Sequence, residues 1–138
     1  MLKFLNLTAL LVAGWLVSVN AFEEVLWEFE RDSSNKPGTV TIQAGDCLTF
    51  KTTTGRFHNV IEFASKDSYK DCDFSGGVEL QMARVEWEEY DHCPEEGVHY
   101  FGCSIGPHCT IGNMKVKVVV TNDPDSNHYL RSGLEDWP

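Results

Sequence analysis

Short runs in which apolar and polar residues alternate dominate the chain from residue 22 onward. A period of two places every second side chain on the same face of a β-strand. Glycine, proline or aspartate separates most of the runs, as turns separate strands. The predicted strands cover residues 25–30, 39–43, 47–51, 57–63, 78–87, 98–102 and 114–120. The pattern predicts an all-β Greek-key sandwich or barrel of about seven or eight strands.

One internal segment lacks this alternation. Residues 64–74 read ASKDSYKDCDF and carry no clean period of two. We therefore expect a short helix or an irregular loop near residues 64–75.

The first 21 residues have the features of a secretory signal peptide. Lys3 precedes an apolar stretch from Leu7 to Val19, and the small residue Ala21 stands before Phe22 as at a cleavage site. An uncleaved membrane anchor is the alternative, but the apolar stretch is short for a span. The predicted organisation is a signal peptide at 1–21, one domain at 22–121 and a polar tail at 122–138.

The chain is strongly acidic, with 21 Asp and Glu against 11 Lys and Arg and a net charge of −10. Nucleic-acid binding requires Lys and Arg to neutralise phosphates, so we expect no nucleic-acid partner. No second apolar stretch follows the first. We expect a secreted protein, or one in the lumen of the secretory pathway, that has no membrane anchor and is a monomer.

Five cysteines are an odd number for an exported protein. In an oxidising compartment, two disulfides and one remaining thiol are the natural partition. Metal ligation would explain a remaining thiol. The cysteines are Cys47, Cys72, Cys93, Cys103 and Cys109.

The segment YFGCSIGPHC at residues 100–109 starts a set of potential metal ligands. His108 follows Cys103 by five residues, Met114 follows six residues later, and His58 lies in a predicted strand upstream. Two imidazoles, a thiolate and a weak thioether form the ligand set of blue-copper sites. Zinc is the competing metal, but it prefers tetrahedral Cys and His sets to which a thioether adds little.

Several short motifs together resemble the phytocyanins, a branch of the cupredoxin family of plastocyanin-like proteins. The resemblance covers residues 22–121 and implies a cupredoxin fold with one type 1 copper ion. It implies His58, Cys103 and His108 as ligands, with an axial Met or Gln. The motifs are HNV at 58–60, YKDC at 69–72, YFGC at 100–103, GPHC at 106–109 and GNMKVKV at 112–118.

The resemblance also implies a disulfide between Cys72 and Cys109 beside the metal. Cys47 and Cys93 then remain, and the family pattern does not require them. We expect them to form a second disulfide, and two free thiols are the alternative.

The axial position departs from the family spacing. The family places the axial residue five positions after the second histidine, which here is Asn113, and Met114 comes one later. A shift of one residue turns every side chain of a strand to the other face. If Met114 points inward, the valines that follow do so too, and Lys115 and Lys117 face water. We therefore expect Met114, with Asn113 or no axial ligand as the alternatives.

Two further residues should support the ligands. Asn59 matches the family residue that braces the loop of the cysteine ligand, and Pro107 should stiffen the turn before His108; ordinary turn chemistry is the alternative for both. Hydrogen bonds near the thiolate tune such a site. The other histidines, expected to be surface or satisfied residues, are His92, His99 and His128.

The predicted function is a secreted carrier of single electrons that uses copper, not an enzyme. Its partner would be an unidentified redox protein or a small-molecule electron donor or acceptor. A copper storage or delivery protein would use the same ligands, and a non-redox interaction module is a further alternative. A cysteine hydrolase would need Cys103 beside a base and an oxyanion site, and it leaves His58 and Met114 without a role.

Overall fold

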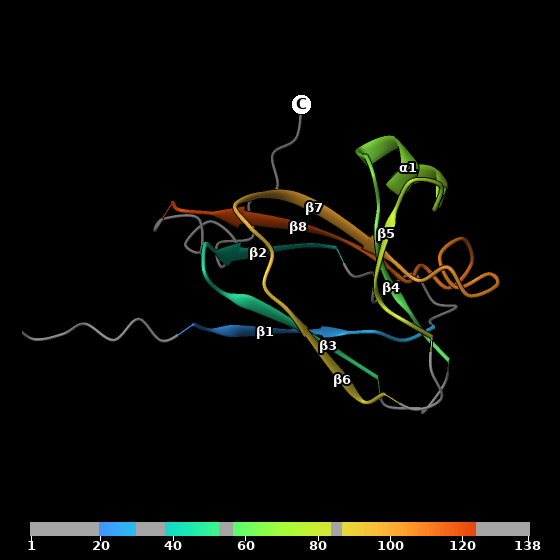
Figure 1. Ribbon diagram of the computed structural model, residues 1–138, viewed down its shortest axis with the longest axis horizontal. Helices are drawn as coiled ribbons and strands as arrows, with labels where there is room; N and C mark the ends of the chain where they lie inside the picture. Colours follow the sequence, from blue (N-terminus) through green and yellow to red (C-terminus); the bar gives the residue numbers. More distant parts are fainter. Residues whose placement is uncertain (1–19, 30–37, 53–56, 84–86, 124–138) are drawn as a thin grey trace, which may run out of the picture.

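The computed structural model describes residues 20–29, 38–52, 57–83 and 87–123 (Figure 1). Within these residues, eight strands and one short helix form a two-sheet sandwich. The elements are β1 (Phe22–Leu26), β2 (Thr39–Gln43), β3 (Cys47–Lys51), β4 (Val60–Glu62), α1 (Lys66–Asp71), β5 (Val78–Gln81), β6 (Glu89–His92), β7 (Gly97–Gly102) and β8 (Lys115–Thr121).

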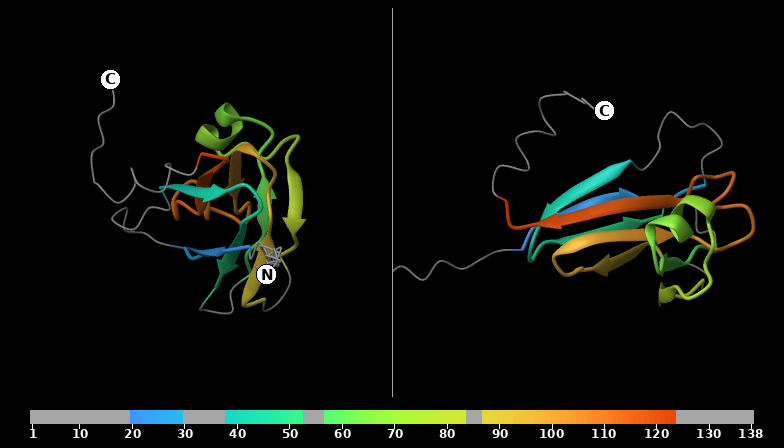
Figure 2. Two further views of the ribbon diagram at one scale, coloured as in Figure 1. Left: turned by 90° about the vertical axis from the view of Figure 1, so that its left-hand side faces the viewer. Right: turned by 90° about the horizontal axis from the view of Figure 1, so that it is seen from above.

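The two sheets are mixed. The smaller sheet has the order β1-β3-β6, and the larger has the order β2-β8-β7-β4-β5. Strands β1 and β3 run parallel, as do β2 and β8, and the other neighbouring strands are antiparallel. The two layers are seen edge-on in Figure 2. The predicted all-β sandwich of seven or eight strands is therefore confirmed.

The core lies between the sheets and follows the predicted alternation. On β8, Val116, Val118 and Val120 are buried, and the residues between them are partly exposed. Each apolar side chain of this size that is removed from water contributes about 1.5–3 kcal/mol. The largest side chains in the core are Trp27, Phe50, Phe101 and Leu48.

Helix α1 occupies part of the segment that lacks alternation. Its N-cap is Ser65, whose hydroxyl accepts a hydrogen bond from the amide of Ser68, and its C-cap is Cys72 in the left-handed conformation. The helix lies outside the sandwich beside the larger sheet (Figure 2). The sequence therefore predicted this helix correctly as one of two possibilities.

The expectation that Lys115 faces water was wrong. Lys115 does lie on the outer face of β8, but its side chain is only partly exposed. Its ammonium donates hydrogen bonds to the carbonyls of Tyr69 and Lys70 at 2.9 and 3.0 Å and lies over the Tyr69 ring. The helix covers this face of the strand, which the alternation within β8 could not indicate.

The predicted strand at residues 78–87 was correct only for Val78–Gln81, which form β5. Strand β5 ends at Gln81 in the larger sheet, and β6 pairs with β3 in the smaller one. The chain changes sheets between them, so one strand cannot continue. In β6, Tyr90 and His92 are partly buried between the more exposed Glu89 and Asp91, and this pattern is too polar to mark a separate strand.

Most of the predicted signal peptide and tail lies outside the described residues. The sheet hydrogen bonding reaches Ala21, whose carbonyl accepts from the Cys47 amide at 2.9 Å and whose amide donates to Asp46 at 2.9 Å. Pairing thus begins at the predicted cleavage site. In the described part of the chain, no helix has the length and apolar character needed to cross a bilayer.

A disulfide joins Cys47, at the start of β3, to Cys93, just after β6. Because Leu48 pairs with His92, the two cysteines face each other as the next pair across the same two strands. The bond closes the smaller sheet at one end. In this structure, these cysteines are therefore not free thiols.

Candidate metal centre

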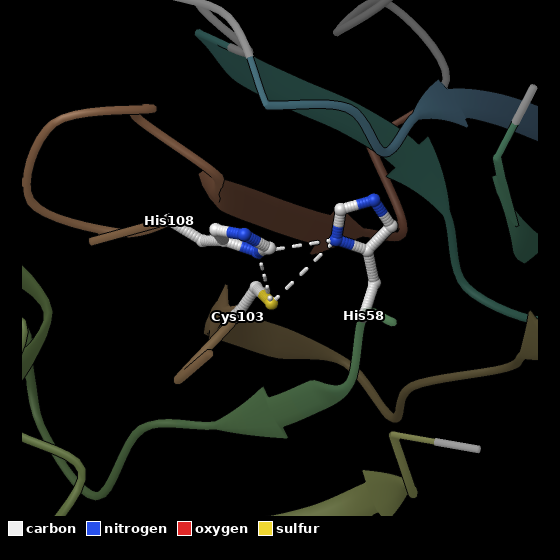
Figure 3. A group of neighbouring side chains, drawn as sticks. All are labelled: His58, Cys103 and His108. Atoms are coloured by element: carbon white, nitrogen blue, oxygen red, sulfur yellow. Dashed lines mark hydrogen bonds between the residues drawn. The ribbon is translucent and has the colours of Figure 1, made fainter. Parts of the chain in front are cut away.

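His58, Cys103 and His108 come from separate segments of the chain and lie close together in space (Figure 3). His58 comes two residues before β4, Cys103 directly follows β7, and His108 lies in the loop between β7 and β8. The two Nδ1 atoms are 3.2 Å apart, and Cys103 Sγ lies 3.4 Å from Nδ1 of His108 and 4.0 Å from Nδ1 of His58. All three potential ligand atoms converge on one point.

The spacing of these atoms fits a single ion. Nitrogen and sulfur ligands lie about 2.0–2.3 Å from a metal, so at ligand–metal–ligand angles of about 100–135° they are about 3.1–4.0 Å from one another. The observed separations of 3.2, 3.4 and 4.0 Å fall in this range. A thiolate with two imidazoles is a donor set that suits copper.

The ligands differ in exposure. His58 and Cys103 are fully buried, whereas His108 is partly exposed beside the exposed residues Gly106 and Pro107. Pro107 directly precedes His108 in the turn that holds both. The carbonyl of Pro107 accepts hydrogen bonds from the amides of Ile111 and Gly112. Solvent therefore reaches the site on the side of His108.

The environment of Cys103 favours a thiol in the metal-free protein. Burial raises the pKa of this thiol above its usual value, and backbone hydrogen bonds from Ile105 and Asn59 oppose the rise. The same two N–H groups would stabilise a thiolate once a metal replaced the proton. A buried thiol with a raised pKa is a poor free nucleophile, but it can ligate a metal that replaces its proton.

Asn59 connects the segment before β4 to the loop that follows Cys103. Its Oδ1 accepts from the amide of Ser104 at 2.9 Å, and its Nδ2 donates to Ser104 Oγ at 2.9 Å and to Glu79 Oε1 at 3.0 Å. The side chain is 3 % exposed. This is the geometry expected of a residue that braces the loop of Cys103.

Two buried tryptophans hold the segment before β4 that carries His58. The indole N–H of Trp87 donates to the carbonyl of His58 at 2.8 Å, and that of Trp27 donates to the carbonyl of Asn59 at 2.9 Å. The sequence reasoning missed both roles. A buried Trp needs an acceptor for its N–H, which was a signal, but the sequence does not identify a carbonyl partner.

Comparison of the chain with models of known protein families identifies its family. The model of the plastocyanin-like domain matches residues 27–113. The chain belongs to this family.

Individual relatives agree with this assignment. A segment of 84 residues is 33% identical to the cucumber peeling cupredoxin of Cucumis sativus, which covers 59% of this chain and 58% of that protein. The match thus spans less than two thirds of that relative. Spinach plantacyanin is 26% identical with a TM-score of 0.52 over 72% of this chain and 99% of its own. Cucumber stellacyanin, 24% identical, shares the fold with a TM-score of 0.56 over 76% and 99%.

Plastocyanin-like membership and the donor set together fit one type 1 copper ion. The axial position favours Met114. Met114 is 1 % exposed, its amide donates to the carbonyl of His108, and its carbonyl accepts from the amide of Cys103. Asn113 has a positive φ of 50° and is partly exposed. Asn113 therefore takes up the extra residue of this plastocyanin-like loop, and Met114 enters the core.

One ring contact outside the predicted set packs against His108. The ring of Phe29 lies 5.2 Å from the His108 ring, and a Cβ on Gly112 would overlap the Phe29 ring. The predicted disulfide between Cys72 and Cys109 is confirmed, and it ties the residue after His108 to the C-cap of α1. No sequence pattern marks Phe29, because its contacts depend on how the segment after β1 meets the loop.

The other two histidines in the described part of the chain, His92 and His99, lie outside this cluster. His99 contacts Glu62 through Nδ1 at 2.7 Å and the Glu95 carbonyl through Nε2 at 2.8 Å. His92 stacks near Tyr90 and is half-buried. His128 lies outside the described residues.

Proposed function

We propose that this protein carries single electrons through one type 1 copper ion, with His58, Cys103 and His108 as ligands and Met114 in the axial position. The convergence of two imidazoles and one buried thiol carries the proposal. Copper in such a site alternates between Cu(II) and Cu(I). The fold and the family support the same conclusion.

Rigidity suits the site to this role. An indole hydrogen bond holds the segment that carries His58. The side chain of Asn59 holds the loop after Cys103, and a disulfide anchors Cys109, next to His108. Residues locked by packing and hydrogen bonds hold ligands in one geometry. A site of this kind changes little between oxidation states, which favours electron transfer over substrate chemistry.

Electrons would enter and leave on the side of His108. The ligand is partly exposed there, and exposed apolar side chains lie in the neighbouring segments: Phe57 precedes His58, Met82 follows β5, and Ile111 is in the loop of His108. Their exposures are 53%, 53% and 64%. A weakly bound redox partner, or a small-molecule donor or acceptor, could dock on such a surface.

The same ligands could store or deliver copper. The buried positions of His58 and Cys103 favour the carrier, because delivery requires rapid release of the ion. We further propose that the protein is exported and is not an enzyme. The two disulfides support export, since such bonds persist in oxidising compartments.

The experiment compares electron exchange with copper exchange. The copper-loaded protein is mixed with a small inorganic reductant in one set of stopped-flow runs and with a copper chelator in another. We expect reduction to be faster than copper loss by several orders of magnitude. Copper loss as fast as reduction would favour delivery and overturn the proposal.

A surface variant tests whether electrons are exchanged on the side of His108. Ile111→Glu should slow reduction by an anionic reductant, because it places a negative charge near His108. Val98→Glu is the matched control, since Val98 is 50% exposed on β7 and lies outside the ligand loop. An equal decrease in the reduction rate of both variants would contradict electron exchange on the side of His108.

A further inference from the structure

Glu79 lies outside the set of residues that the sequence motifs assign to the metal centre. It is an exposed residue on β5, an edge strand of the larger sheet. Its Oε1 accepts a hydrogen bond from Nδ2 of Asn59 at 3.0 Å. An ionised carboxylate can only accept hydrogen bonds, so it selects the amino end of the Asn59 amide.

The orientation of the Asn59 amide matters because its remaining polar atoms bond Ser104, in the loop after Cys103. The second hydrogen of Nδ2 goes to Ser104 Oγ, and Oδ1 receives the amide of Ser104. In the reversed orientation, Oδ1 would face the Glu79 carboxylate and Nδ2 would face the Ser104 N–H. Glu79 therefore favours the one orientation in which every partner is matched.

The pairing of β4 and β5 brings these side chains together. Val60 pairs with Gln81 and Ile61 pairs with Glu79, so the register shifts between the two pairs. An extra residue of this kind re-aims nearby side chains, and such irregularities are common beside functional sites. Here the shift occurs next to Asn59, the residue that Glu79 contacts.

We propose that Glu79 is a positioning residue for the copper site. It acts through Asn59, whose side chain holds Ser104 and whose backbone N–H donates to Cys103 Sγ. Hydrogen bonds to a charged acceptor are stronger than neutral ones. From the neighbouring strand β5, the Glu79 carboxylate thus keeps the Asn59 backbone N–H within hydrogen-bonding distance of Cys103 Sγ.

The first test needs no copper. Hydrogen exchange of the Ser104 amide is measured by NMR in the metal-free protein. Glu79→Ala should speed this exchange by about fivefold, the equivalent of one ordinary hydrogen bond, and Glu79→Gln should restore most of the protection because it keeps an acceptor oxygen. Glu23→Ala is the control, since Glu23 is an exposed glutamate on the edge strand β1. Unchanged exchange in Glu79→Ala would overturn the proposal.

The second test uses the reduction potential and rests on the copper function proposed above. Loss of a negative charge should raise the potential in both Glu79 variants. Loosening of Asn59 should weaken the N–H donor to Cys103, which lowers the potential in Glu79→Ala alone. We expect the Ala variant to lie below the Gln variant, and equal potentials would count against positioning. If the protein bound no copper, the proposed function would fail while the exchange experiment still decided the role of Glu79.

Discussion

At the scale of single residues, the account depends on whether Met114 or Asn113 would supply the fourth ligand to a bound copper ion. Met114 is buried and hydrogen-bonded through its backbone to His108 and Cys103. Asn113 has a positive φ and a partly exposed position. These differences make the two neighbours separable by mutation.

We predict that Met114→Leu shifts the reduction potential and Asn113→Ala does not. An axial thioether tunes the potential of a blue-copper site, and its removal leaves the three stronger ligands in place. Leu conserves the volume of Met, so the free energy of unfolding should fall by less than about 1.5 kcal/mol. Redox titration of both variants tests this, and a shift confined to Asn113→Ala would reverse the assignment.

A second prediction at this scale concerns acid stability. Burial lowers the pKa of His92; the Glu62 carboxylate opposes this effect, and His99 adds to it. Because the folded pKa lies below the unfolded one, the unfolded state takes up the proton first. His92 therefore stabilises the fold above the unfolded pKa of about 6.5, and that contribution is lost as the pH falls.

The measurement is urea unfolding of the metal-free protein at several pH values between neutral and mildly acid. Wild type should lose more stability on acidification than His92→Asn, which cannot take up a proton. The loss of packing against Phe101 is the same at each pH and cancels in the comparison. Parallel losses in the two proteins would show that His92 does not contribute.

The ligands could be predicted from the sequence, but most of their supports could not. His58, Cys103 and His108 stand in motifs that resemble a family, and the strand alternation correctly predicted that Met114 is buried. Supports such as Trp27, Trp87, Phe29 and Glu79 act through contacts between distant segments. No local pattern marks such contacts.

At the scale of elements, helix α1 and strand β8 stabilise each other through Lys115. Its ammonium binds the carbonyls of Tyr69 and Lys70 at the C-terminal end of the helix. Cations at this end of a helix complement its dipole and satisfy its last carbonyls. The next residue after the helix, Cys72, is tied by a disulfide to the ligand loop.

We predict that Lys115→Met destabilises the protein by about 1–2 kcal/mol, with allowance for its partial exposure. The Met variant keeps the apolar stem and removes the ammonium. Lys117→Met is the control on the same face of β8. Amide exchange of Tyr69, which bonds the Ser65 carbonyl, should rise in Lys115→Met alone. Equal effects of the two substitutions would contradict this role.

The elements also show where alternation succeeds and fails as a predictor. Strands β2 and β3 have the predicted bounds, because each lies between clear turn signals. The strand predicted at 78–87 was correct only for Val78–Gln81, because the chain passes from the larger sheet to the smaller one before β6 begins at Glu89. Alternation reports which face is buried but not which sheet a strand joins.

At the scale of the whole molecule, the two disulfides lie at opposite ends of the sandwich. Cys47 and Cys93 close the end at the start of β3 and the end of β6, whereas Cys72 and Cys109 join α1 to the ligand loop (Figure 1). The first should therefore affect stability without affecting the copper site.

We predict that replacing Cys47 and Cys93 by alanine lowers the free energy of unfolding by about 4 kcal/mol, since the bond closes a loop of 46 residues. The spectrum of bound copper should not change. Replacing Cys72 and Cys109 should cost a similar amount and also alter the spectrum. Denaturant unfolding and visible spectra of both double variants test this, and an altered copper spectrum in the first would refute the separation.

The central claim is that Cys103, His58 and His108 bind one type 1 copper ion. The most direct measurement is the visible and EPR spectrum of residues 22–138, refolded and loaded with Cu(II), beside a Cys103→Ser control. We predict an intense blue thiolate-to-copper band and narrow copper hyperfine splitting, both lost in the control. A colourless protein, or copper bound without the thiolate band, would contradict the claim.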